Sequence, residues 1–207
     1  PLLAVEMPAL CSRDQNPNEV TILSYHEIAL KSETLDPTYT VTPENFAKQI
    51  QWLIDNGYHF ISVDTLLNYR KAKTPLPPKA VLITFDDGYK SVYDNAFPIL
   101  KRHHIPTVIA LVGSWLASHD VVDFDGHKID RGKFLSQTEI KEMVQSGLVE
   151  VASHSYASHK GIIGNPQGNR QPALTTHQWL VDTQRYEDDA HYEARVKEDL
   201  AHNITFL

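Results

Sequence analysis

Short apolar runs recur along this chain, and helix-like stretches separate them. The clearest run, residues 80–85, reads AVLITF, with a threonine as its only polar residue. Similar runs cover residues 20–25, 60–63, 107–112 and 148–152. Strands that are apolar on both faces are typical of parallel sheets with helices on each side. This pattern constrains the fold more than any other feature of the sequence.

The stretches between these runs carry helical signals. Residues 43–57 follow a capping Thr42 and repeat apolar side chains at helical spacing. Ser136 and Glu139 have the spacing of a capping box before a helix over residues 139–146. Further helices are predicted over residues 65–71, 91–103 and 187–207, and a long loop over residues 160–185. Repeated strand–helix units predict a parallel sheet or an α/β barrel.

The bulk composition fits one domain. The chain has 207 residues, 42% of them hydrophobic, which is enough for one buried core. We assign residues 1–19 to an N-terminal extension and residues 20–207 to the domain. The formal net charge of -7 argues against nucleic acid and anionic membranes as partners. Cys11 is the only cysteine, so no internal disulfide forms, and whether it carries a lipid stays open.

Polar side chains follow three of the predicted strands. His26 and Glu27 come after the first run, Asp86 and Asp87 come after residues 80–85, and the stretch SHSYASH at 153–159 follows the last run. In parallel α/β folds the carboxyl ends of the strands open onto one face, where chemistry takes place. We therefore expect these residues to share one site.

His154 and His159 suit a metal site. On a helix, residues five apart point about 140° away from each other, whereas on a loop they can converge. Two imidazoles and one carboxylate, with open positions for water and substrate, form a common catalytic metal set. The alternative of two surface histidines stays open on this spacing alone.

The adjacent carboxylates Asp86 and Asp87 repel each other, and a division of roles accounts for the pair. One carboxylate binds the metal while the other stays ionised beside bound water and accepts its proton. Gly88 allows a sharp turn after them. The alternative is a helix cap followed by a solvated acid in a turn. His26 ends a strand on the same face and is the third element of the expected site.

Two motifs carry a family resemblance. TFDDGY at 84–89 together with HSYASH at 154–159 resembles the NodB-homology domain of the polysaccharide deacetylases, carbohydrate esterase family four. YHEI at 25–28 and GNPQGN at 164–169 resemble the poly-β-1,6-N-acetyl-D-glucosamine N-deacetylases of biofilms. The resemblance implies an α/β fold, a distorted (β/α)7 barrel that is circularly permuted. The family's aromatic-proline-tyrosine-glycine segment is not found before Leu207, so we expect a barrel that is incomplete at its C-terminal end.

The resemblance also implies roles for the matching residues. Asp86 is expected to be the catalytic base and His26 the general acid, and Asp87, His154 and His159 are expected to hold one divalent metal ion. Zinc, nickel, cobalt and iron all suit this ligand set, so the identity of the metal stays open.

The substrate implied by the resemblance is a β-1,6-linked N-acetylglucosamine exopolysaccharide, from which a metal-dependent hydrolase removes N-acetyl groups and releases acetate. Tyr89 and Tyr156 are expected to contact its sugar rings. Such a substrate places the protein in the periplasm, at the outer membrane or outside the cell, with membrane association through a lipid anchor or an export machinery. Chitin oligomers or peptidoglycan as substrates, and a non-catalytic glycan-binding role, stay open as alternatives.

Overall fold

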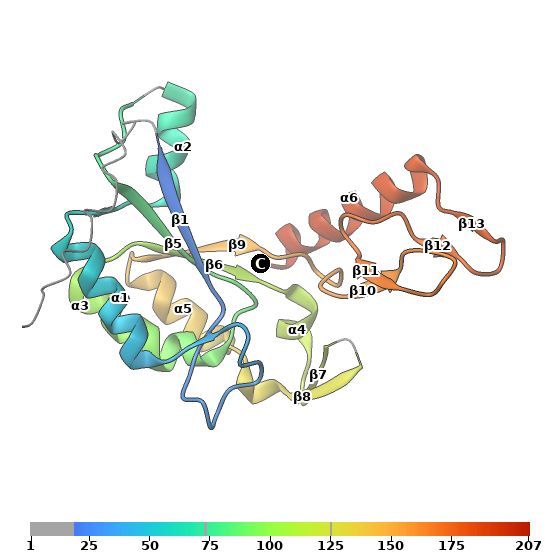
Figure 1. Cartoon of the computed structure of the whole chain (residues 1–207), viewed down its shortest axis with the longest axis horizontal. Coiled ribbons are helices and arrows are strands. Elements are labelled where there is room, and N and C mark those ends of the chain that lie inside the picture. The colour runs from blue at the N-terminus through green and yellow to red at the C-terminus, as the bar shows by residue number, and fades with distance from the viewer. Residues whose placement is uncertain (1–18, 73, 125) are drawn as a thin grey trace, which may run out of the picture.

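The computed structural model describes residues 19–207 apart from positions 73 and 125, and a parallel sheet lies at its centre. The strands β1 (Val20–Tyr25), β5 (Ala80–Phe85), β6 (Thr107–Leu111) and β9 (Val149–Ser153) lie side by side in that order (Figure 1). The short strand β4 (His59–Phe60) pairs with the first residues of β5. All of these pairings are parallel, as the alternating pattern of the sequence predicts.

Two helices begin at the capping residues that the sequence signals. Helix α1 (Pro43–Asp55) starts after Thr42, whose side chain accepts a hydrogen bond from the backbone N–H of Asn45. Helix α5 (Gln137–Gln145) has the full capping box between Ser136 and Glu139. The other helices are α2 (Val63–Ala72), α3 (Phe97–His103), α4 (Gly113–Ala117) and α6 (Asp189–Phe206), with a π-helical turn at Val92–Ala96 and a 3₁₀ turn at Arg131–Lys133. Helix α2 begins two residues before the predicted start, and α6 begins two residues after it.

The core lies on both faces of β5. Val81, Ile83 and Phe85 are fully buried in a large apolar cluster that includes residues of α1, α3 and α5. Ala80 and Leu82 alternate with them and belong to a second cluster, next to α2. Side chains alternate between the two faces of a strand, so the continuous apolar run reflects burial on both sides. Figure 1 shows α1, α3 and α5 together on one side of the sheet.

The outer strand β1 does not share this burial. The side chain of Ile22 is 54% exposed, and among the described strands β1 pairs only with β5. The expectation that each apolar run is buried on both faces is therefore wrong for β1. An apolar run is not proof of a central strand, because edge strands with exposed apolar residues have the same local sequence.

The prediction of a long loop over residues 160–185 is also wrong. This segment contains β10 (Gly161–Ile163) paired with β11 (Arg170–Pro172), and β12 (Trp179–Leu180) paired with β13 (Arg185–Tyr186). These strands are too short to show a two-residue period in the sequence. With α6 they form a group beside the central sheet (Figure 1).

Two further short pairs border the site. Strand β2 (Glu27–Ile28) pairs with β3 (Thr40–Val41), and β7 (Val121–Phe124) pairs with β8 (His127–Asp130). Among the described helices, none is both long and apolar enough to cross a bilayer. The predicted N-terminal extension, except its last residue, and Cys11 lie outside the described residues.

Substitution in β5 should show how far the sheet depends on its buried strand. We expect Ile83→Ala to lower the free energy of unfolding by about 2–5 kcal/mol, because it leaves a cavity in the main core. The matched change on the exposed strand, Ile22→Ala, should cost less than about 1 kcal/mol. Urea unfolding followed by circular dichroism measures both values, and equal losses would contradict this description of the core.

Candidate metal centre

The turn after β5 separates the two adjacent carboxylates. Asp87 has a left-handed backbone, with φ of 72°, and Gly88 follows with φ of 78°. A Cβ atom on Gly88 would lie 2.7 Å from Cδ2 of Leu111, so the turn requires glycine. The turn buries the side chain of Asp87, which is 4% exposed, and leaves that of Asp86 23% exposed. The two carboxylates therefore occupy different environments despite being neighbours in sequence.

Asp87, His154 and His159 converge. Oδ1 of Asp87 lies 3.3 Å from Nε2 of His154 and 3.1 Å from Nε2 of His159. One candidate ligand atom from each residue lies within 4.8 Å of the other two. The loop after β9 thus brings the two imidazoles together, as the spacing argument requires.

The geometry of these three atoms fits a cation. Oδ1 of Asp87 is buried and makes no well-directed hydrogen bond with the described residues, although both imidazole nitrogens are near it. Buried carboxylate oxygens are normally hydrogen-bonded or bound to a metal. A carboxylate oxygen and two imidazole nitrogens are also the donor types that zinc-like divalent metals prefer. The arrangement therefore supports a divalent metal site.

The charges of the three groups are coupled. Burial alone would raise the pKa of Asp87, but polar contact and charge interaction with His154 and His159 outweigh it and hold the pKa well below its ordinary value. Contact with the carboxylate of Asp87 and its negative charge outweigh burial at His154 and raise the pKa of that imidazole. Asp87 is thus a buried anion that attracts positive charge to this point of the structure.

His26 and Asp86 lie beside this centre. Nε2 of His26 is 4.0 Å from Oδ2 of Asp86, and both side chains are about a quarter exposed. The hydroxyl of Ser24 donates a 2.8 Å hydrogen bond to the same Oδ2. Strand β1 therefore supplies a group that orients the open carboxylate, and the residue directly after the strand is the histidine. Nothing in the sequence singled out Ser24, because its partner is 62 residues away.

The buried carboxylate of Glu27 organises the loop that follows His26. Its Oε2 accepts hydrogen bonds of 2.8, 2.9 and 2.8 Å from the Thr34 hydroxyl, the Leu35 N–H and the Thr40 hydroxyl. The loop ends at Tyr39, whose ring lies 5.0 Å from that of His26 between centroids. Tyr39 is 58% exposed and carries no motif, so sequence reasoning missed it.

Aromatic packing fixes the ring of His159. Its centroid lies 4.8 Å from that of Trp115, with the rings edge to face, and 5.4 Å from that of Phe124. The Nδ1 atom of His159 is buried without a hydrogen-bond partner among the described residues. Packing against the two aromatic rings, rather than a hydrogen bond to Nδ1, thus orients the imidazole so that Nε2 points toward Asp87.

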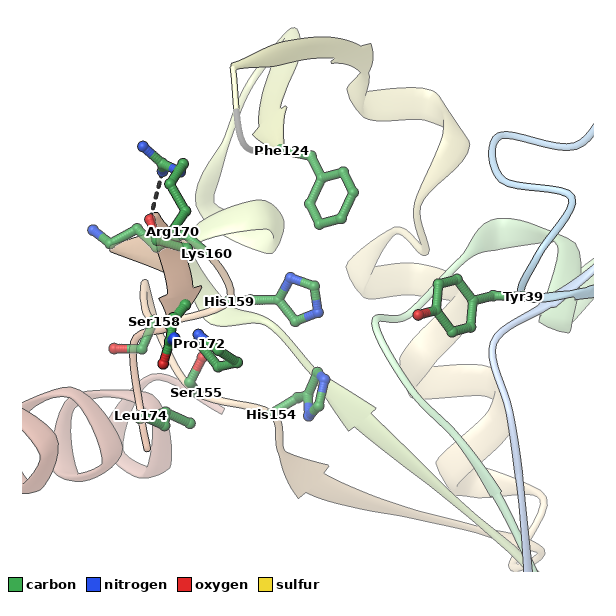
Figure 2. A pocket seen from close by; sticks show the side chains of 12 residues that line it. Tyr39, Phe124, His154, Ser155, Ser158, His159, Lys160, Arg170, Pro172 and Leu174 are labelled. Carbon is green, nitrogen blue, oxygen red and sulfur yellow. Dashed lines mark hydrogen bonds between the residues drawn. The ribbon is translucent and has the colours of Figure 1, made fainter. Parts of the chain in front are cut away.

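A pocket of about 530 Å³ opens beside the two histidines (Figure 2). Figure 2 shows Tyr39 across the pocket from His154 and His159, with Phe124 above the two histidines. Lys160 and Arg170 lie on the side of the histidines that faces away from Tyr39. The pocket joins residues from β7, β10, β11, the loop before β3 and the loop after β9. Its aromatic lining and its position beside the candidate centre suit a sugar.

The structure does not bring the two tyrosines expected to contact sugar into this pocket. Tyr89 is 7% exposed and stacks on Phe134 with 5.3 Å between ring centroids. Tyr156 stacks on His202 of α6, with 3.8 Å between ring centroids. Among the described residues that line the pocket, the aromatic side chains are those of Tyr39 and Phe124, beside the two histidines.

Comparison with known proteins decides the family. The family model described as polysaccharide deacetylase matches residues 73–204, more than half of the chain. The chain belongs to the polysaccharide deacetylase family. Two solved deacetylase structures resemble this chain: a de-N-acetylase from Aggregatibacter actinomycetemcomitans and the BpsB deacetylase domain from Bordetella bronchiseptica. The first has a TM-score of 0.82 and 32% sequence identity, and the match covers 90% of this chain and 73% of the de-N-acetylase chain. The second has a TM-score of 0.78 and 34% sequence identity, and the match covers 91% of this chain and 74% of the BpsB domain chain.

These likenesses confirm the predicted α/β deacetylase fold, although the described strands form an open sheet. Curated relatives are named poly-beta-1,6-N-acetyl-D-glucosamine N-deacetylase. The relative from Escherichia coli strain K12 is 35% identical over 193 residues, which is 92% of this chain and 28% of the relative. The one from Staphylococcus epidermidis is 31% identical over 159 residues, which is 72% of the chain and 52% of the relative. The chain thus spans between about a quarter and a half of the length of these curated relatives.

Gly88 offers a test of the turn that separates the carboxylates. We expect Gly88→Ala to lower the free energy of unfolding by about 1–2 kcal/mol for the left-handed backbone plus about 1–3 kcal/mol for the contact with Leu111. Gly57 is the matched control: its φ is 71°, but nothing lies within 4 Å of the place that a Cβ atom would occupy, so Gly57→Ala should lose only the first amount. Urea unfolding of both variants checks the difference, and equal losses would argue against a tight turn at Gly88.

Proposed function

We propose that this chain is a metal-dependent N-deacetylase domain that removes acetyl groups from a β-1,6-linked N-acetylglucosamine polymer. The observation that carries the proposal is the convergence of Asp87, His154 and His159 beside the open carboxylate of Asp86, at a pocket of a polysaccharide deacetylase-family chain. The names of the relatives from Escherichia coli and Staphylococcus epidermidis support this choice of polymer.

Asp87, His154 and His159 are the residues that would hold the metal. A divalent cation bound there supplies Lewis-acid chemistry, which polarises an acyl oxygen and acidifies water. Zinc, nickel, cobalt and iron are all compatible with two imidazoles and one carboxylate. The buried Oδ1 of Asp87, which lacks a well-directed hydrogen bond from the described residues, is the feature of this chain that most favours a bound cation.

Asp86 acts as the general base in this proposal. Its carboxylate is open to the site, and the hydroxyl of Ser24 fixes the position of Oδ2. Asp86 accepts a proton from the water that attacks the acetyl carbon. Because Asp87 is committed to the two imidazoles, the neighbouring carboxylate remains available for proton transfer.

His26 acts as the general acid. As the bond between the acetyl carbon and the amide nitrogen breaks, the protonated imidazole donates a proton to the departing nitrogen, so that acetate and a free amino sugar leave. The ring of Tyr39 packs against His26 and is exposed to the pocket, where it can support both the imidazole and a sugar ring. We expect an enzyme that acts on such a polymer to work outside the cytoplasm, in the periplasm, at the outer membrane or beyond the cell.

A substrate panel tests this function. We expect acetate release from β-1,6-linked N-acetylglucosamine oligomers to exceed release from β-1,4-linked chitin oligomers and from peptidoglycan. Treatment with a chelator should abolish release because the Lewis acid is removed, and adding back Zn²⁺, Ni²⁺ or Co²⁺ should restore it. Full activity in the metal-free protein would contradict the metal-dependent reaction, and preference for another glycan would change the substrate.

Asp86→Asn separates proton transfer from metal binding. We expect kcat to fall by about 10²–10⁴-fold with the metal content unchanged, because the amide cannot accept the proton. Ser24→Ala is the milder companion: it removes one hydrogen bond to Asp86 and should lower kcat by about tenfold, for a bond of about 1–1.5 kcal/mol. Acetate assays and elemental analysis on the same preparations give both numbers. A fully active Asp86→Asn variant would exclude Asp86 as the base.

A further inference from the structure

The loop that carries both candidate metal-binding histidines, residues 154–159, is held through its backbone. We call it the histidine loop. The carbonyl oxygens of Ser155 and Tyr156 accept hydrogen bonds of 3.2 and 2.8 Å from the N–H groups of Gly113 and Ser114, at the start of α4. These bonds fix one edge of the loop between the two imidazoles.

Helix α6 holds the other edge. The carboxylate of Asp199 accepts two hydrogen bonds of 2.8 Å, from the N–H of Tyr156 to Oδ2 and from the N–H of Ala157 to Oδ1. Both bonds use an ionised acceptor, and such bonds are stronger than neutral ones. In the histidine loop, two carbonyls are therefore bound by α4. Two amides are bound by the side chain of Asp199, which lies 42 and 43 residues further along the chain.

Asn203, one turn after Asp199, anchors the same helix. It is fully buried, and its Nδ2 donates to the carbonyl of Leu111 at 3.0 Å and to the hydroxyl of Ser153 at 2.8 Å. These acceptors are the last residues of β6 and β9. A Cβ atom on Gly113, at the start of α4, would lie 2.1 Å from Oδ1 of Asn203, so α6 and α4 approach as closely as glycine permits.

The histidine loop has a backbone that needs this support. Ser155, between the two histidines, has φ of 73°, a conformation that side-chain-bearing residues adopt at a cost in free energy. The ring of Tyr156 also stacks on His202 of α6, at an angle of 11° between the planes. The contacts with α6 thus stabilise a loop conformation that the isolated segment would not favour.

The same helix braces the wall of the pocket. Arg195 donates hydrogen bonds to the carbonyls of Ala173 and Thr176, at 2.8 and 3.1 Å, and pairs with the carboxylate of Glu187. These contacts tie the segment after β11, which includes the pocket residue Leu174, to α6. One helix therefore connects the histidine loop with a wall of the pocket.

We propose that Asp199, anchored by Asn203 on α6, is a positioning residue that holds His154 and His159 at a common point, so that metal affinity depends on this helix. The inference rests on the proposed metal-dependent function. Asp199 touches neither imidazole in this arrangement; it acts through the two backbone amides between them. Residues that orient metal ligands from outside the coordination sphere commonly contribute 10–100-fold to affinity.

The test is the affinity of the chain for Zn²⁺, measured by isothermal titration calorimetry on wild type and Asp199→Asn. The substitution keeps the size of the side chain but places an NH₂ group against one of the amides. We expect the dissociation constant to rise about 10–100-fold. Glu198→Gln removes the same charge from the preceding, exposed position of α6 and should bind Zn²⁺ as wild type does. Circular dichroism and the melting temperature establish that each variant is folded.

Asp199→Glu is a second variant for the case that Asp199→Asn does not fold. It keeps the charge but displaces the carboxylate by one methylene, so its dissociation constant should lie between those of wild type and Asp199→Asn. A lower melting temperature with unchanged Zn²⁺ affinity would make Asp199 a purely structural residue and overturn the inference. Failure of the proposed function has a different signature, since wild type itself would then bind no Zn²⁺, and the inference would fall with it.

Discussion

The buried carboxylate of Asp87 is the constraint around which this site is arranged. An ionised carboxylate at this depth is costly unless positive or hydrogen-bonding groups surround it. The nearest groups are two imidazoles, and the turn at Gly88 moves the neighbouring Asp86 toward solvent. The backbone of one turn thereby gives two chemically identical side chains different environments, and different environments are what allow different roles.

The sheet supplies the rest of the geometry. Its strands are parallel, so residues that follow β1, β5 and β9 meet at one edge although they are far apart in sequence. Backbone bonds continue past the strand ends: the N–H of Asp86 donates to the carbonyl of Tyr25, and that of His154 donates to the carbonyl of Leu111. Two side chains then fix the groups that follow the strands: Ser24 of β1 binds the carboxylate of Asp86, and Asp199 of α6 binds the backbone of the histidine loop.

The sequence was sufficient to predict what depends on local pattern. The run at β5, the capping box before α5 and the polar residues at strand ends are short-range features, and the structure contains them as expected. Ser24 and Asp199 could not be found in this way, because only folding brings each to its partner. The burial of Tyr89 was missed for a related reason: an aromatic residue beside a motif suits both a core and a sugar site, and its direction depends on Phe134.

The separation of Asp87 from the histidine loop along the chain has a thermodynamic consequence. A cation held by these residues would join the end of β5 to the end of β9 and act as a cross-link between two halves of the sheet. Binding to the native state alone adds free energy to folding in proportion to the logarithm of ligand concentration, about 2.7 kcal/mol at one hundred times the dissociation constant. With such a cation bound, the thermal stability of this protein would depend partly on the concentration of free divalent metal around it.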